Sequence, residues 1–169
     1  MQSELLLLIG ISFSLGFTPG PNNAVASFSG FNFGIKKTIP LILGVGFGYT
    51  VLVILINFVL ISTFIKYPII QEIIRILGSF FLIYLAYKIS FSETSSETKN
   101  INPVKFFDTF FFQFINPKGV MAAITLISNF VKDENYMKTS FTVIIVCSLT
   151  AFISITSWTF VGKFLRKFA

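Results

Sequence analysis

Three stretches of the chain carry no charged residue and are long enough to cross a lipid bilayer. They cover residues 5–35, 38–65 and 139–162. About 20 apolar residues in an α-helix span the roughly 30 Å of hydrocarbon in a membrane, and each stretch reaches that length. Charged residues make up only 12% of the chain, against about 25% in soluble domains. The sequence therefore predicts an integral membrane protein and excludes soluble, disordered and fibrous classes.

The predicted fold class is an all-α membrane protein with five transmembrane helices. These helices are expected at about 3–33, 39–64, 69–89, 106–130 and 137–161. Residues 91–104 form a polar linker, rich in Ser, Glu, Thr, Lys and Asn and without apolar periodicity. The linker divides a single membrane domain, 1–169, into a first repeat at 1–90 and a second, incomplete repeat at 105–169.

The basic residues indicate how the chain lies in the membrane. The net charge of +6 would suggest a nucleic-acid partner in a soluble protein, but here the cations lie in loops and at helix ends, so no nucleic acid is expected. One side carries eight cations and the other carries four: Lys36, Lys37, Lys88, Lys99, Lys105, Lys163, Arg166 and Lys167 against Lys66, Arg75, Lys132 and Lys138. Because cytoplasmic loops are enriched in Lys and Arg, we expect the N-terminus outside and the C-terminus in the cytoplasm.

The residue types that most enzymes need are scarce in this chain. It has no histidine, and its one cysteine, Cys147, lies inside the last apolar stretch. Histidine is the commonest metal ligand and acid–base group, and a lone cysteine forms no intramolecular disulfide. All seven acidic residues fall at segment ends or in loops. We expect neither an enzyme nor a bound cofactor or metal.

Proline interrupts two of the expected helices near their centres. Residues 19–22 read Pro-Gly-Pro-Asn in the first helix, and residues 116–119 read Asn-Pro-Lys-Gly in the fourth. Proline removes a backbone donor and clashes with the preceding turn, so each helix is predicted to kink or to break into half-helices. Backbone groups freed in this way cannot face lipid, so they must face protein or a wet cavity. The alternative is that each kink serves helix packing only.

The spacing of the two breaks predicts an inverted repeat. Pro19 and Pro117 lie 98 residues apart, and three spans precede the second repeat, which inverts its orientation. Inverted-repeat transporters bind substrate near the midplane between interrupted helices at corresponding positions. A complete second repeat would place a sixth helix near 167–187, whereas the sequence ends at Ala169. We expect a 3+2 remnant of a 3+3 inverted repeat, with helices 1 and 4 broken.

Each break supplies a candidate binding group. A half-helix that starts at Pro21 would present the amides of Asn22, Asn23 and Ala24, which together favour a carboxylate. Lys118 is the only charge between residues 109 and 131, and a cation at mid-membrane costs about 2.5–3.5 kcal/mol. Its compensation is expected from a substrate carboxylate, carbonyls freed by Pro117, the Asn116 side chain, or loss of its proton. The alternative is a lysine at the edge of its segment.

Several motifs in order resemble those of one transporter family. Residues 16–23, Gly-Phe-Thr-Pro-Gly-Pro-Asn-Asn, resemble the signature of the LysE/RhtB family of amino-acid exporters, and residues 116–118, Asn-Pro-Lys, resemble the motif of its fourth helix. The Gly-rich stretch 34–48 and the stretch 76–86 resemble its second and third helices. The resemblance covers about 5–161.

The resemblance implies a carrier in the plasma membrane of a prokaryote, commonly with six helices, that exports amino acids or related metabolites in exchange for protons. Its partners would be the lipid bilayer and an amino-acid-like substrate, and a homodimer is compatible with it. Tyr49 stands where many members carry an acidic or small residue, so the coupling ion stays open. The substrate-binding residues implied are Pro19, Gly20, Pro21, Asn22, Asn23, Asn116, Pro117 and Lys118.

We therefore hypothesise an alternating-access exporter whose zwitterionic substrate enters a cavity between the first and fourth helices. Asn22 and Asn116 would order the irregular backbone and bond the substrate amine, and Lys118 would supply charge or a change of protonation. One alternative is a non-transporting, truncated relative or a membrane subunit that needs a partner chain. Another is a metal or inorganic-ion exporter, for which this chain lacks histidine and intramembrane acids.

Overall fold

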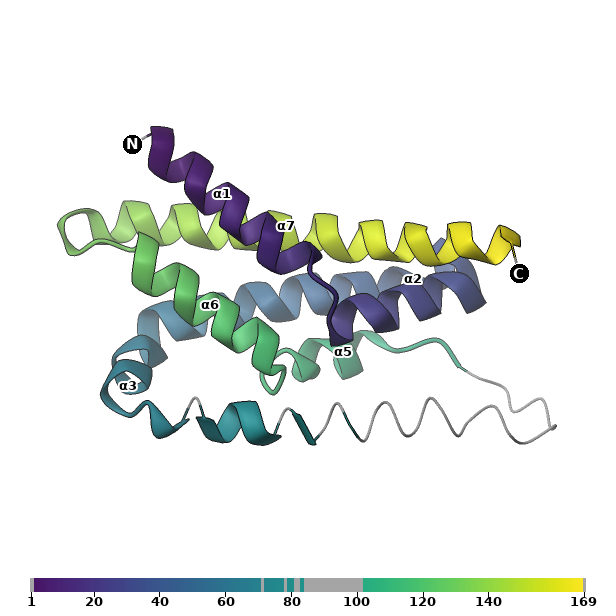
Figure 1. Ribbon diagram of the computed structural model, residues 1–169, viewed down its shortest axis with the longest axis horizontal. Coiled ribbons are helices and arrows are strands. Elements are labelled where there is room, and N and C mark those ends of the chain that lie inside the picture. The colour runs from purple at the N-terminus through teal and green to yellow at the C-terminus, as the bar shows by residue number, and fades with distance from the viewer. Residues whose placement is uncertain (1, 71, 78, 81–82, 84–101, 169) are drawn as a thin grey trace.

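The computed structural model describes residues 2–70, 72–77, 79–80, 83 and 102–168. This part of the chain is helical and contains no strand (Figure 1). The elements are α1 (Gln2–Phe17), α2 (Pro21–Leu55), a π-helical turn (Ile56–Leu60), α3 (Ile61–Lys66), α5 (Phe106–Phe112), α6 (Pro117–Phe130), a short 3₁₀ turn (Asp133–Asn135), α7 (Tyr136–Leu165) and a final 3₁₀ turn (Arg166–Phe168). The predicted all-helical class is confirmed.

Helix α2 is a hairpin of two helical arms that meet at Gly34. Gly34 has φ 73° and ψ 176°, a left-handed conformation that glycine adopts without strain. The Ser29 and Thr38 hydroxyl oxygens lie 2.9 Å apart, whereas nine residues of straight helix would separate them by about 13.5 Å. Figure 1 shows the chain reversing here, with a first arm at 21–33 and a second arm at 35–55. Lys36 and Lys37 therefore lie at a turn, as predicted.

Length and composition identify two or three candidate membrane spans in the described residues. The helical stretches Pro21–Leu60, which reverses at Gly34, and Asp133–Phe168 each qualify, and the pair α5 and α6, bent by 55°, counts as a third if it is one broken span. Helix α1 is apolar but shorter. Of the expected third helix, residues 69–70, 72–77, 79–80 and 83 are helical, and residues 84–89 lie outside the described residues. Five spans therefore stay a prediction.

Glycines bring the helices together at backbone distance. A Cβ added to Gly30 would collide with the Thr159 carbonyl oxygen, and one on Gly162 with that of Ser27, so the first arm of α2 lies directly against α7. A Cβ on Gly48 would lie 2.6 Å from the Phe110 carbonyl oxygen of α5. Small residues permit this close packing in membranes, where apolar burial alone does not drive helices together. Helix α2 therefore packs closely against both α7 and α5.

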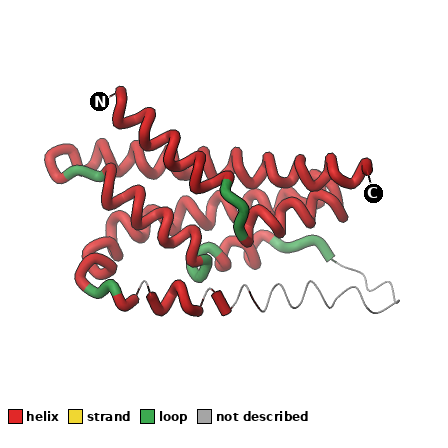
Figure 2. Tube along the Cα trace, in the orientation of Figure 1, coloured by secondary structure: helices red, strands yellow, loops and turns green. Residues whose placement is uncertain are grey.

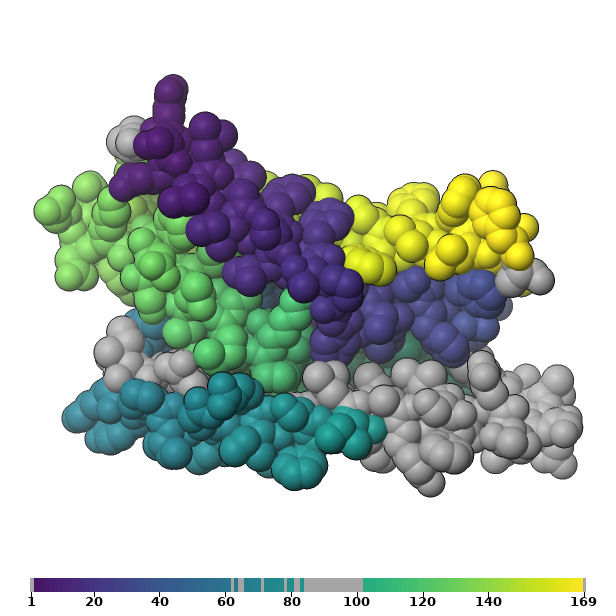
Figure 3. All heavy atoms as spheres, in the orientation of Figure 1, coloured from purple at the N-terminus to yellow at the C-terminus, as the bar shows by residue number. Residues whose placement is uncertain are grey.

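The outer surface of the molecule suits a lipid environment. Helix α7 exposes large apolar side chains one or two turns apart at Phe141, Ile145, Leu149, Ile153, Phe160 and Phe164. Such a continuous apolar stripe would be unfavourable in water. Figure 3 shows α1 lying across α6 and α7, and Figure 1 places the two termini at opposite ends of the long axis. This axis is the direction in which the helices would cross a membrane.

Candidate functional site

The first helix break lies between α1 and α2. Thr18 and Pro19 leave the helix, and Gly20 is fully extended at φ −170° and ψ 179° before Pro21 opens α2. Proline suits this first helical position because its missing amide hydrogen would have no partner there. The Asn23 side-chain amide donates to the carbonyl oxygens of Gly16 at 3.0 Å and Thr18 at 2.9 Å. Asn23 thus satisfies carbonyls that the break has freed.

One detail of the first break differs from the sequence prediction. The Ala24 amide donates to the Gly20 carbonyl oxygen at 2.9 Å, as the first hydrogen bond of α2. It is therefore not available to a ligand, and the prediction that Ala24 would help bind a carboxylate is wrong. Only the groups that precede it, at the start of α2, are left without a partner in their own helix.

The second break lies between α5 and α6. The chain tightens after Phe112, where the Gln113, Phe114 and Ile115 amides each donate to a carbonyl three residues earlier. Asn116 then leaves the helix, and Pro117 opens α6 with its axis turned by 55°. This break keeps its backbone bonded to itself, so its side chains are free for other partners.

The two breaks are in contact near the centre of the molecule (Figure 2). The Lys118 Nζ donates a hydrogen bond to the Thr18 carbonyl oxygen. The Asn22 and Gln113 side-chain amides bond each other reciprocally, at 2.8 Å and 3.2 Å. The expected partners of Lys118 included carbonyls of its own break, but the observed one comes from the first break. A freed carbonyl on one helix thus compensates a cation on another.

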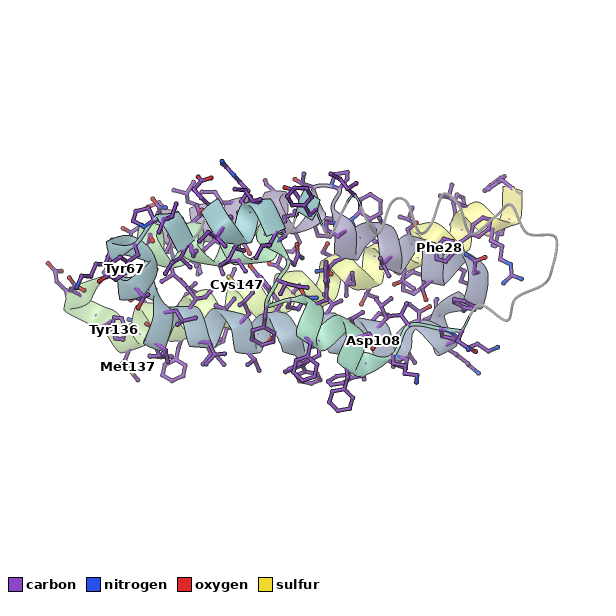
Figure 4. The ribbon with its side chains drawn as sticks, turned by 90° about the horizontal axis from the view of Figure 1, so that it is seen from below. Phe28, Tyr67, Asp108, Tyr136, Met137 and Cys147 are labelled. Carbon is purple, nitrogen blue, oxygen red and sulfur yellow. The ribbon has the colours of Figure 1, made fainter. Side chains whose placement is uncertain are left out.

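A cavity of about 70 Å³ opens where the breaks meet, between α1, α2, α6 and α7. That space admits a few water molecules. Figure 4 shows Cys147, which lines the cavity, near the middle of the molecule, between Tyr67 and Tyr136 toward one end and Phe28 and Asp108 toward the other. The cavity therefore lies near the middle of the long axis of the molecule.

Five of the eight predicted site residues line this cavity: Gly20, Asn22, Asn23, Asn116 and Lys118. The three prolines do not. Pro19 is exposed, Pro21 is buried and Pro117 is half-buried. Their contribution is to the shape of the backbone, because they set where each half-helix starts.

The charge that lines the cavity is positive. Among the described residues that line it, Lys118 is the only charged one. The N-terminus of α6 lies beside it and adds a partial positive charge. The Asn116 side chain is 2% exposed, and its Oδ1 accepts no hydrogen bond from the described residues. Lys118 and the N-terminus of α6 therefore favour an anion, and Asn116 adds a buried acceptor at the same cavity.

Sequence reasoning missed several residues of the site. Gln113 is fully buried and joins the two breaks, and its signal was a lone amide among the phenylalanines at 110–114. Ser12, Thr150 and Ser154 line the cavity, whereas Gln113 does not. No sequence signal separates them from the many Ser and Thr residues that bond their own helix.

Comparisons with known proteins give the chain a family. The model of the LysE type translocator family matches residues 13–168. The cysteine/O-acetylserine efflux proteins of Salmonella typhimurium (strain LT2) and Escherichia coli (strain K12) are 31% and 27% identical to it over 117 residues. Each match covers 69% of this chain and 60% of the relative's own length. No solved structure matches the chain. The chain belongs to the LysE type translocator family, a family of multi-pass membrane transporters and not of enzymes.

Proposed function

We propose that this LysE type translocator exports a zwitterionic amino acid or a close relative of one by alternating access. The observation that carries the proposal is the meeting of two broken helices at a mid-depth cavity that contains Lys118. Broken helices at corresponding positions form the substrate sites of many secondary transporters. The names of the relatives, which are efflux proteins for cysteine and O-acetylserine, support the same class of substrate.

In this proposal the α-carboxylate of the substrate lies against Lys118 and the first turn of α6. Lys118 gives one hydrogen bond to Thr18, and an ammonium group has three donors, so two are left for the carboxylate. The N-terminus of α6 adds a favourable dipole. Release of the substrate would leave Thr18 as the only partner of Lys118, or it would accompany a change in the protonation of Lys118. Such a change would couple transport to protons.

The substrate ammonium group binds the free Oδ1 of Asn116. A buried polar atom without a hydrogen bond costs about 1–3 kcal/mol, and a charged donor recovers that cost when it binds. Asn22 was also expected to bind the amine, but its side chain is engaged by Gln113. We therefore assign the amine to Asn116 and the closure of the cavity to Asn22.

Pairs of residues 98 positions apart support two inverted repeats, at 1–90 and 105–169. The Thr50 hydroxyl donates to the Ser148 hydroxyl at 2.9 Å, across 98 residues. A Cβ on Gly20 would lie 2.8 Å from the Cδ of Lys118, its equivalent at the same offset. Equivalent residues of two repeats touch each other only near the axis that relates the repeats. We propose that this axis passes through both pairs.

Alternating access then exchanges the conformations of the two repeats about that axis. In this proposal the Asn22–Gln113 amide pair closes the end of the cavity toward the lysine-rich turn of α2 in the present state. At the offset of 98, the equivalent pair is Leu15 and Val120, which would close the opposite end in the other state. The proposal includes five spans, with the lysine-rich end in the cytoplasm and the N-terminus outside.

Transport by the purified chain in proteoliposomes tests this function. Vesicles preloaded with labelled cysteine or O-acetylserine should release it faster with the protein than without it. Lys118→Met should reduce this release at least tenfold, because the carboxylate loses its counter-charge. Lys138→Met is the matched control, since Lys138 is exposed at the start of α7. Undiminished efflux by Lys118→Met would remove Lys118 from the mechanism, and no efflux by the unmodified chain would favour a non-transporting subunit.

A further inference from the structure

We propose that three hydroxyls on one wall of the cavity form the subsite for the substrate's side chain. Ser12, Thr150 and Ser154 make up this hydroxyl wall. It would restrict transport to amino acids whose side chain is small, uncharged and able to form a hydrogen bond. This inference rests on the proposed function and deepens it, because it names the class of substrate within the amino acids.

The hydroxyl wall is buried and comes from two helices. Ser12 lies on α1 and is 4% exposed, and Thr150 and Ser154 lie one turn apart on α7 and are each 3% exposed. Ser12 Oγ donates to Thr150 Oγ1 at 3.2 Å, and Ser154 Oγ donates to the Gly16 carbonyl oxygen at 2.8 Å. These bonds join α1 to α7, so the three hydroxyls hold fixed positions.

The hydrogen-bond inventory of the wall leaves groups for a ligand. Ser12 and Ser154 each use their single hydroxyl hydrogen on the protein. Among the described residues, Thr150 Oγ1 only accepts, so its own hydrogen stays available, and all three oxygens retain accepting capacity. A hydroxyl, a thiol or an ester oxygen on a substrate can bond here. A site built to bond such a group discriminates against analogues that lack it, because its own polar groups are then left without partners.

Close packing at Gly16 and the small volume of the cavity limit the size of the substrate's side chain. A Cβ on Gly16 would lie 2.9 Å from Thr150 Cγ2 and 3.7 Å from Ser154 Cβ, so only glycine leaves the wall undisturbed. The whole cavity measures about 70 Å³, roughly half the 150 Å³ of an engineered cavity that binds benzene. Aromatic side chains are therefore excluded from this state.

Charge excludes a second group of substrates. The described residues that line the cavity include no Asp or Glu, and the one charge among them is the cation Lys118. The side chain of a lysine or arginine substrate would find no counter-charge in the cavity. It would also be repelled by Lys118, because two like charges at short range repel each other. The wall therefore fits neutral polar side chains, such as those of serine and cysteine.

The test compares competing substrates in proteoliposomes that contain the full chain. L-serine, L-cysteine, L-alanine, L-phenylalanine and L-lysine are offered against labelled L-serine, and wild type should prefer the first two. Thr150→Val should lower the serine-to-alanine ratio about threefold to tenfold, since one hydrogen bond is lost at nearly constant shape. Thr150→Ser keeps the hydroxyl and should keep the ratio. Ser157→Ala is the matched control, because Ser157 also lies on α7 but bonds its own helix at Ile153 and does not line the cavity.

A second readout separates the subsite from transport itself. Cys147 lines the cavity and is the only cysteine of the chain, so bound substrate should slow its alkylation by N-ethylmaleimide. L-serine should protect Cys147 in wild type and at least threefold less in Thr150→Val. Transport of amino acids with an unchanged serine-to-alanine ratio in Thr150→Val would overturn the subsite alone. If no amino acid were transported, the proposed function would fail, and equal protection by serine and alanine would then overturn the subsite as well.

Discussion

The two helix breaks have similar sequences but are stabilised in different ways. The first leaves the helical conformation completely at Gly20, and the Asn23 side chain bonds the carbonyls that are freed. The second stays close to helical, with backbone bonds through Ile115, and bends the chain by 55°. The first break thus depends on a side chain for its structure, whereas the second leaves the side chains of Asn116 and Lys118 available to the cavity. We infer that the first break has a structural role and that the second break binds substrate.

The largest effect is expected on stability, from a substitution at the first break. Asn23→Ala would remove both hydrogen bonds to the Gly16 and Thr18 carbonyls. Each carbonyl keeps a second donor, Ser154 for Gly16 and Lys118 for Thr18, so each lost bond should cost about 0.5–1.5 kcal/mol and the protein should lose about 1–3 kcal/mol of stability. The midpoint of thermal unfolding in detergent, followed by size-exclusion chromatography, measures this. A midpoint equal to that of wild type would show that the first break does not depend on Asn23.

The next effect should appear in transport and not in stability. Asn116→Ala removes an acceptor that bonds no described residue, so we expect a stability change within about 1 kcal/mol. Efflux should fall about tenfold, since the substrate ammonium loses a charge-assisted hydrogen bond. Parallel measurement of thermal midpoint and efflux distinguishes this variant from Asn23→Ala. The same changes in thermal midpoint and efflux in both variants would refute the distinction between a structural first break and a substrate-binding second break.

A smaller effect is expected from the amide pair that joins the two breaks. Gln113→Ala would remove the bonds to Asn22 that we propose as the closure of one end of the cavity. An impermeant thiol reagent should then label Cys147 about fivefold faster when it is applied to the lysine-rich side of oriented vesicles. This factor corresponds to a shift of about 1 kcal/mol in the equilibrium between the closed and open states of the cavity. The rate from the opposite side should not rise. Faster labelling from both sides would indicate general loosening of the structure and not an opened closure.

The smallest effect is expected at the proposed axis between the repeats. Ser148→Ala would remove a hydroxyl that accepts from Thr50 and itself donates to the Ile144 carbonyl. Hydrogen bonds between membrane helices average about 0.6 kcal/mol, so stability should fall by less than 1 kcal/mol. Because residues on the axis keep their contact in both states, Cys147 labelling should not change from either side. A side-dependent change would place Ser148 in the closure and not on the axis.

The sequence predicted the positions of the breaks well because their causes are local. Proline cannot donate to the hydrogen-bond ladder of a helix but suits its first position, and α2 and α6 begin at Pro21 and Pro117. The cost of an intramembrane cation similarly identified Lys118 from its neighbours in sequence. Gln113 was missed because a single amide in an apolar run has many potential partners, and only the position of α5 beside α2 selects Asn22.

The amino-acid sequence by itself determined that this chain is a helical membrane protein, where its helices break, and which charge lies between their ends. The tertiary structure alone decided that Thr18 is the partner of Lys118, that Asn23 bonds the first break, and that Ser12, Thr150 and Ser154 line the same cavity. The physical reason is the range of the forces involved. Backbone geometry and desolvation act on a residue through its immediate neighbours, whereas the choice of partner depends on close packing between distant helices, such as that of Gly30 and Gly162 between α2 and α7.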